Sequence, residues 1–158
     1  MRNPVDREFS KYRFHFQLSS RKKFKAKNQN AESFHRYVVQ RLNGTDNAWL
    51  TSRYHRYVET ALSLFERKNL LFLHFEQFVE DPMRCLEEQV LPFLELDPYL
   101  TSTKKRILKE LNKGEHANTS KMSYGMLYKT RLLLMKYFSP YNRKLADLLG
   151  DDVWTWGY

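Results

Sequence analysis

The sequence has a single cysteine, Cys85, among its 158 residues. One cysteine excludes an internal disulfide framework and a cysteine-based metal site. Glycine and proline number five each, which argues against low-complexity sequence or a long flexible linker. Residues 1–158 contain no apolar run near the roughly 18 residues that span a membrane, and no recognisable signal peptide. What remains is the composition of a folded domain with a real core.

Acidic residues are also scarce relative to basic ones. The 18 Asp and Glu residues face 27 Lys and Arg residues, which gives a net charge of +9. Such an excess predicts an anionic partner, such as nucleotide phosphates, nucleic acid, acidic glycans or a membrane surface. The densest basic cluster is Arg21, Lys22, Lys23, Lys25 and Lys27. This cluster is interpreted either as a contact for a polyanionic glycan or as a solvated loop.

Helical periodicity dominates what is present. The spacing of apolar residues predicts helices over 4–17, 32–42, 51–67, 82–94, 101–112 and 126–137. The run LLFLHF at 70–75 has the length of a strand buried on both faces. SPYN at 139–142 predicts a break or kink, and Gly150 suits a helix C-cap. The pattern indicates the helix-rich part of an α/β domain, whose other strands we expect upstream of Met1.

The first residues combine three features that suit a phosphate. Asn3 is a good N-cap, Pro4 fits the first helical position, and Arg2 precedes both. An arginine fork binds phosphate in a bidentate manner, and a helix N-terminus adds free N–H groups. Ser10 adds a hydroxyl on the second turn. The alternative is a surface arginine, an ordinary cap and a solvent-facing serine. A helix that begins directly after Arg2 also predicts that the sequence starts in the middle of a domain.

Four segments carry a resemblance to a known family: RNPVDREFSKY, SRYHRYVETALSLFERKNLLFLHFEQFVEDP, FLELDPY and KYFSPYNRKLADLLGDDVWTW. In this order they resemble the Golgi carbohydrate (glycosaminoglycan) sulfotransferases. The nearest type is the N-acetylgalactosamine 4-sulfate 6-O-sulfotransferase, with the heparan sulfate sulfotransferases more distant. The resemblance implies an α/β, P-loop nucleotide-hydrolase-like fold. It also implies the donor 3′-phosphoadenosine 5′-phosphosulfate and no metal.

The resemblance assigns roles to particular residues. Arg2 and Ser10 match the residues that grip the 3′-phosphate of the donor. Lys121 lies where relatives carry a basic loop over the nucleotide or the substrate, and the alternative is a solvated lysine. Tyr54 and His55 correspond to the acceptor cleft, and the alternative is a packed tyrosine beside an exposed histidine. The cluster residues Arg21, Lys22 and Lys23 would contact a sulfated or acidic polysaccharide acceptor.

Two other residues are expected to have structural roles. The resemblance implies that Glu76 ties the predicted strand to the next helix. His74, inside LLFLHF, is interpreted as a core or sheet-edge histidine, with a catalytic base as the alternative.

The sequence departs from the family at the 5′-phosphosulfate loop, a Lys with Gly-Thr-Thr or a similar run after the first strand. The candidate segments NKGEH and SYGML do not follow a predicted strand. We therefore expect residues 1–158 to form one partial sulfotransferase domain that lacks the N-terminal strand and phosphate loop. Its catalytic residues are unknown and expected upstream of Met1, and the chain alone is expected to be inactive.

Two Asn-x-Ser/Thr sequons, at Asn43 and Asn118, fall in predicted loops. They suit the Golgi lumen, where the resemblance places the full-length protein as a membrane enzyme with a missing N-terminal anchor. The competing hypothesis is a non-catalytic basic module that binds polyanionic glycan or nucleic acid, with aromatics such as Phe14, Phe16 and Phe24 interleaved among the cations. No RNA-module signature supports this alternative, so no nucleic-acid partner is expected.

Overall fold

A computed structural model describes residues 1–21, 30–44, 49–97, 103, 105–107, 109–110 and 124–158. The longer helices are α1 (Pro4–Arg21), α2 (Ala31–Leu42), α3 (Tyr54–Leu64) and α8 (Tyr128–Leu149). The shorter ones are α4 (Phe75–Glu80), α5 (Pro82–Cys85) and α6 (Leu91–Phe93), with a π-helical segment, Leu86–Val90, between α5 and α6. Short 3-10 turns lie at Leu50–Ser52, Arg67–Asn69 and Asp152–Thr155. Of the predicted helix at 101–112, residues 103, 105–107 and 109–110 are described, and these are helical.

Helix α1 begins as its sequence predicts. Oδ1 of Asn3 accepts a hydrogen bond from the backbone N–H of Val5 at 3.0 Å, and Asp6 places an acid in the first turn. Both features stabilise a helix N-terminus. Val5 and Tyr12 lie on the buried face of the helix. The helix continues to Arg21, four residues beyond the predicted end.

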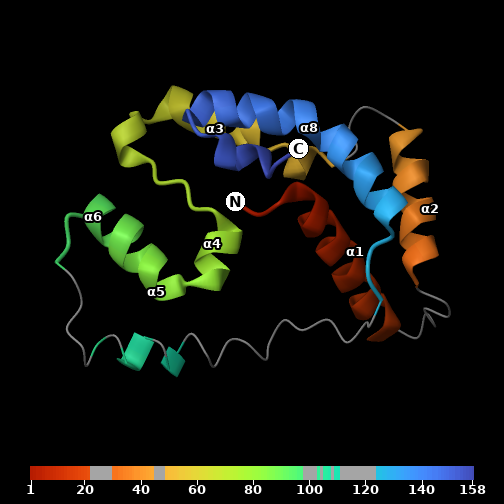
Figure 1. Cartoon of the computed structure of the whole chain (residues 1–158), viewed down its shortest axis with the longest axis horizontal. Coiled ribbons are helices and arrows are strands. Elements are labelled where there is room, and N and C mark those ends of the chain that lie inside the picture. The colour runs from red at the N-terminus through yellow and green to blue at the C-terminus, as the bar shows by residue number, and fades with distance from the viewer. Residues whose placement is uncertain (22–29, 45–48, 98–102, 104, 108, 111–123) are drawn as a thin grey trace.

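Two apolar clusters hold the longer helices together (Figure 1). The first joins α1, α2 and α8, and the second joins α3, α8 and the turn after α8. Helix α8 runs through both clusters and contacts each of the other three long helices. The buried members of the first cluster are Val5, Tyr12, Phe34, Val38, Trp49, Leu134 and Phe138; those of the second are Val58, Leu145, Ala146 and Trp154.

SPYN does not break the helix, because α8 passes through Pro140 without ending; the alternative of a kink stays a prediction. A proline inside a helix costs about 3 kcal/mol. Leu134, Phe138 and Leu145 lie on the same face of α8 and are almost fully buried, whereas Pro140 is exposed. Burial of that face outweighs the local cost of the proline. The C-terminus of α8 does follow prediction, since Gly150 adopts φ +69° as its C-cap.

The predicted strand at 70–75 is also wrong. Residues 70–74 are non-helical, α4 starts at Phe75, and no strand occurs among the described residues. Met1 nevertheless pairs with this segment, because its N–H₃⁺ group donates to the carbonyl of Leu73 and its carbonyl accepts from the N–H of Phe75 at 2.6 Å. This is the bonding pattern of a parallel bridge. A bridge at one residue is too short to make a strand.

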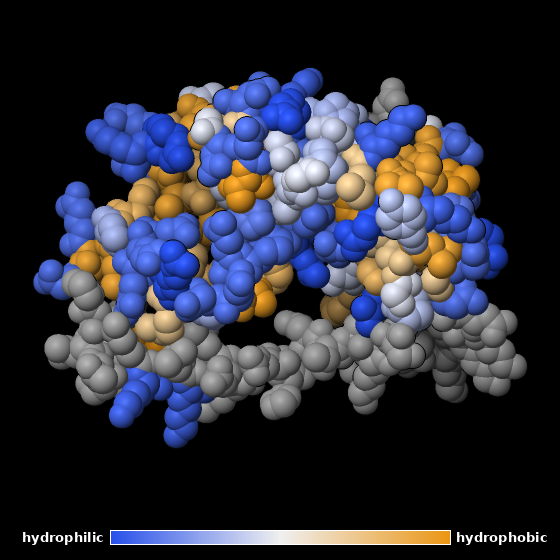
Figure 2. All heavy atoms as spheres, in the orientation of Figure 1, coloured by the Kyte–Doolittle hydropathy of each residue, from blue (hydrophilic) through white to orange (hydrophobic). Residues whose placement is uncertain are grey.

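Helices α4–α6, with the π-helical segment, form an arm that lies to one side of α1 and α2 in Figure 1. Oδ1 of Asp81 accepts from the N–H of Arg84 at 2.9 Å and caps α5, which starts at residue 82 as predicted. Several large apolar side chains of this region are exposed: Phe75, Val79, Phe93, Leu94 and Leu96. Apolar patches are visible on both halves of the face in Figure 2. None of the helices in the described part of the chain is long and apolar enough to cross a membrane.

Candidate functional site

The guanidinium of Arg2 sits at the entrance to α1. It lies over the ring of Phe75, 5.1 Å from the ring centroid, in a cation–π contact. Within the described residues, no carboxylate forms an ion pair with it. The side chain is half-buried. Arg2 is therefore a positioned cation whose charge is available to an anion beside the N-terminus of an 18-residue helix.

The backbone that follows Arg2 is held by residues distant in sequence. The N–H of Asn3 donates to Oε1 of Glu76 at 2.8 Å. Oδ1 of Asn3 accepts from Val5 and also from the phenol of Tyr158, at 3.0 Å each. The Glu76 bond fits the structural role expected of that acid. It ties the start of α4 to α1 and not a strand to a helix, since residues 70–74 form no strand. The cap of α1 is thus fixed from two further parts of the chain.

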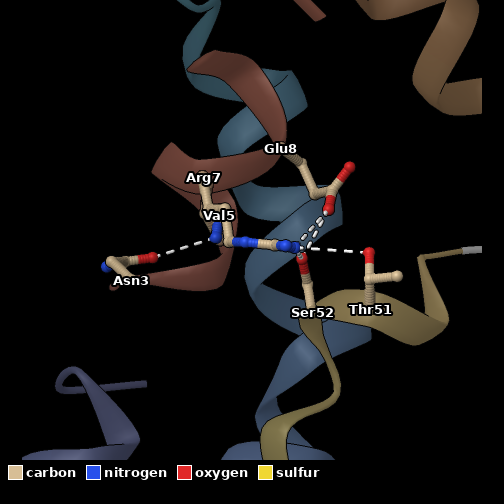
Figure 3. A network of polar contacts seen from close by, with 6 residues as sticks. All are labelled: Asn3, Val5, Arg7, Glu8, Thr51 and Ser52. Carbon is tan, nitrogen blue, oxygen red and sulfur yellow. Dashed lines mark hydrogen bonds and ion pairs between the residues drawn. The ribbon is translucent and has the colours of Figure 1, made fainter. Parts of the chain in front are cut away.

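A second polar network fixes the next turn of α1 (Figure 3). Arg7 donates to the hydroxyl of Ser52, to Oγ1 of Thr51 at 3.3 Å and to Oε1 of Glu8 at 3.3 Å. The hydroxyl of Ser52 in turn donates to Oε1 of Glu8. Glu8 and Ser52 are buried, and the Arg7 side chain is 34% exposed. This network attaches α1 to the turn before α3 and satisfies a carboxylate that burial would otherwise penalise.

Ser10 follows on the same side of α1 as Arg7, one turn further along. Its side chain is half-buried and forms no hydrogen bond within the described part of the chain. Arg2 and Ser10 thus both belong to α1 and its entrance, and no hydrogen bond joins them. Their assignment to one phosphate stays a prediction.

Tyr54 and His55, predicted together for an acceptor cleft, have different neighbours. Tyr54 lies beneath Arg7, whose guanidinium is 5.9 Å from the ring centroid, and its other neighbour is Trp156, with ring centroids 6.1 Å apart. Burial raises the pKa of the Tyr54 phenol. His55 stacks on Tyr141 of α8, with ring centroids 5.5 Å apart and an interplanar angle of 8°. Only Tyr54 borders the entrance to α1.

His74 is a core histidine, as predicted. Its ring packs against Trp154 and Trp156, with centroids 5.4 Å from each, and these two rings also contact each other. Nδ1 lies 3.2 Å from Oε2 of Glu76, without hydrogen-bond geometry. Burial lowers the pKa of His74 and outweighs the neighbouring carboxylate. A neutral imidazole therefore packs behind Glu76 and supports it.

Several predicted site residues lie outside the described residues, namely Lys22, Lys23, Lys121 and Asn118. Arg21 ends α1, and its side chain is likewise not described. Asn43, the other sequon, is exposed at the C-cap of α2. No group of three or more His, Cys, Asp or Glu side chains in the described ranges is placed to hold a metal ion.

Four residues of the site were not predicted: Arg7, Glu8, Ser52 and Tyr158. The position of Glu8 could have indicated a buried, hydrogen-bonded carboxylate. It lies four positions after Pro4 and four before Tyr12, on the buried face of the helix. Ser52 and Tyr158 offered none, since their partners are distant in sequence.

Comparison with known proteins identifies the family to which these residues belong. The model of the sulfotransferase domain matches residues 1–144. This chain belongs to the sulfotransferase domain family. Membership implies a P-loop-like fold, and the described residues are helix-rich. The matched span includes Arg2, Asn3, Arg7, Glu8 and Ser10.

The similar proteins are carbohydrate sulfotransferases. Carbohydrate sulfotransferase 15 of Mus musculus is 24% identical over 182 residues, and the one from Homo sapiens is 22% identical over 179 residues. Each alignment covers 99% of this chain and 30% of the relative, so the chain spans under a third of their length. No solved structure matches the chain. The resemblance to carbohydrate sulfotransferases, inferred above from four segments, is confirmed.

Proposed function

We propose that this sulfotransferase-family chain binds the 3′-phosphate end of 3′-phosphoadenosine 5′-phosphosulfate. The observation that carries the proposal is Arg2. Its guanidinium is fixed over Phe75 at the start of α1, with no carboxylate of the described residues paired to it. A guanidinium fork at the positive end of a helix dipole suits a phosphate monoester. Ser10 would add a hydroxyl donor from the second turn.

The proposed reaction is transfer of the sulfuryl group from this donor to a hydroxyl of a carbohydrate, in line with the names of the relatives. The acceptor class we propose is a sulfated or acidic polysaccharide, consistent with the net charge of +9. Tyr54, which borders the entrance to α1, is the described residue best placed to meet an acceptor. His55 packs against α8 and is the weaker candidate.

The proposal assigns to this chain the 3′-phosphate half of the donor site. None of its sequence resembles the 5′-phosphosulfate loop of the family, and no catalytic base is assigned. Residues 1–158 are accordingly proposed as part of a sulfotransferase domain. A lumenal Golgi address belongs to the same proposal, with exposed Asn43 as a glycan acceptor.

The test compares two nucleotides that differ only in the 3′-phosphate. Titration calorimetry should show that the chain binds 3′,5′-adenosine bisphosphate more tightly than 5′-AMP. Arg2→Ala should reduce this preference by about ten- to a hundred-fold, the usual weight of charge-assisted hydrogen bonds. Ser10→Ala should reduce it less, because a neutral hydroxyl donates a weaker bond.

Arg36→Ala is the matched control. It removes the same charge from an exposed position on α2 and should leave the preference unchanged. Equal affinity of the wild-type chain for both nucleotides would contradict the proposal. Equal affinity combined with a steep dependence on salt would favour the basic binding module instead.

A further inference from the structure

The turn formed by residues 156–158, here called the C-terminal turn, reaches back to the start of α1. Trp156 and Gly157 both adopt left-handed backbone conformations, with φ of +53° and +76°. Two such residues in succession reverse the chain, and the phenol of Tyr158 then lies against the first turn of α1. Figure 1 shows the two ends of the chain near each other.

The C-terminal turn holds Asn3 from two sides. The hydroxyl of Tyr158 donates to Oδ1 of Asn3 at 3.0 Å. Nε1 of Trp156 donates to Oε2 of Glu76 at 3.4 Å, while Oε1 of the same carboxylate accepts from the N–H of Asn3. One residue of the turn therefore contacts the side chain of Asn3 directly, and another acts on its backbone through Glu76.

The Tyr158 phenol is suited to a fixed, donating role. Its ring packs against the first apolar cluster, and burial raises the pKa of the hydroxyl, so it keeps its proton at every physiological pH. Asn3 Oδ1 carries no proton and can only accept. The direction of this hydrogen bond is thus determined. The same oxygen also accepts from Val5, so the bond from Tyr158 fixes the oxygen that caps α1.

We propose that Tyr158 is a positioning residue for the donor site, which orients Arg2 through the Asn3 cap. The inference rests on the proposed function, because it concerns the same 3′-phosphate. Arg2 adjoins Asn3, so a shift of the cap moves the guanidinium relative to the N-terminus of α1. The match to the family covers residues 1–144, so this contact comes from outside the matched span.

The decisive variant is Tyr158→Phe, which removes the hydroxyl and keeps the ring. We expect its preference for 3′,5′-adenosine bisphosphate over 5′-AMP to fall about three- to ten-fold, as for one lost hydrogen bond. A residue with a purely structural role would lower the melting temperature and leave the ratio of the two affinities unchanged. Tyr12→Phe is the matched control. It also removes a phenol hydroxyl, but from α1 itself, where that hydroxyl bonds to Ser33 of α2 at 3.2 Å rather than to Asn3. It should keep the wild-type ratio.

A double-mutant cycle tests whether Tyr158 acts through Arg2. In an Arg2→Ala background, Tyr158→Phe should have no further effect on the ratio. An equal effect in both backgrounds would overturn the inference. Asn3→Ser supplies an independent variant should Tyr158→Phe fail to fold, since serine still caps the helix but is one carbon too short to reach Tyr158. It should reproduce the lost preference, and an unchanged ratio would overturn the inference.

The outcomes separate the two proposals. A wild-type preference that persists in Tyr158→Phe and in Asn3→Ser overturns the role of Tyr158 and leaves the proposed function standing. A wild-type chain with no preference for the 3′-phosphate overturns both. A preference that falls in both variants, with Tyr12→Phe unchanged, supports both.

Discussion

The four long helices and the arm of α4–α6 differ in how their buried apolar residues are organised. In the long helices these residues form two clusters that α8 links, and Phe34, Phe138 and Leu134 have no exposed surface, although Leu64 and Tyr128 are exposed. In the arm, Cys85 and Leu91 are buried but belong to neither cluster, and Val79 is 57% exposed and Phe93 37% exposed. Polar contacts follow the same division, since the buried Glu8 network belongs to α1 and the arm carries an exposed Arg84–Glu88 pair. The comparison teaches that stability resides in the long helices, although the arm supplies Phe75 and Glu76 to the site.

The largest expected effect separates two phenylalanines. Phe138→Ala should lower the free energy of unfolding by about 3–5 kcal/mol, because it leaves a cavity in a closed core. Phe93→Ala should lower it by about 1 kcal/mol or less, because the ring is already partly solvated. Urea denaturation of both variants measures the difference. Similar losses would show that the arm is as well packed as the long helices.

The next effect compares two ion pairs, Arg7–Glu8 in α1 and Arg84–Glu88 in the arm. Glu8→Ala should cost about 2 kcal/mol, because it leaves the buried Ser52 hydroxyl without its acceptor and Arg7 without a carboxylate. Glu88→Ala, in the arm, should leave the unfolding midpoint unchanged, since both partners of its pair are exposed. A stable Glu8→Ala variant would mean that water replaces the carboxylate in this network.

A smaller effect is expected at the end of α8. Gly150→Ala should destabilise the protein by about 1 kcal/mol, because the position requires φ of +69° while no neighbouring atom would obstruct a methyl group. The matched control is Gly125→Ala, at a position that has no positive φ and no atom within 4 Å of an added Cβ. The measurement is the melting temperature of each variant. Equal melting temperatures would show that the cap contributes nothing.

The smallest effect is a dependence of stability on pH that arises from two histidines, His55 packed on α8 and His74 packed on the turn after α8. Burial lowers the pKa values of His55 and His74 below the ordinary 6.5, and nearby cations act in the same direction on His55. The unfolded chain then binds more protons than the folded chain, so stability is complete above pH 6.5 and declines as the pH falls through it. His74→Phe should flatten this decline in denaturation curves taken at several pH values. If stability of the variant falls with pH as steeply as that of the wild type, the pH dependence arises from other groups.

Local sequence predicted the local structure well and the distant contacts poorly. The Asn3 cap, the Asp81 start and the Gly150 end were predictable because each depends on residues within one helical turn. The strand at 70–75 was wrong because strand pairing depends on a neighbour that composition does not reveal. Of the break or kink predicted at 139–142, the break is absent because burial of Leu134, Phe138 and Leu145 holds α8 together there. Arg2 could be proposed for the site from its place before a helix. Tyr158 could not, because nothing near it in the sequence points to Asn3.

The long-range hydrogen bonds of Asn3 have a consequence for the order of folding. Helix α1 can form early, since its bonds are local, but its cap is complete only when Glu76 and then Tyr158 reach it. Contacts across such separations form late, after the entropy of closing the intervening loops has been lost. During synthesis, the first turn of α1 therefore waits for residue 158. This turn is one of the last features of the described residues to mature, although it precedes nearly all of them in sequence.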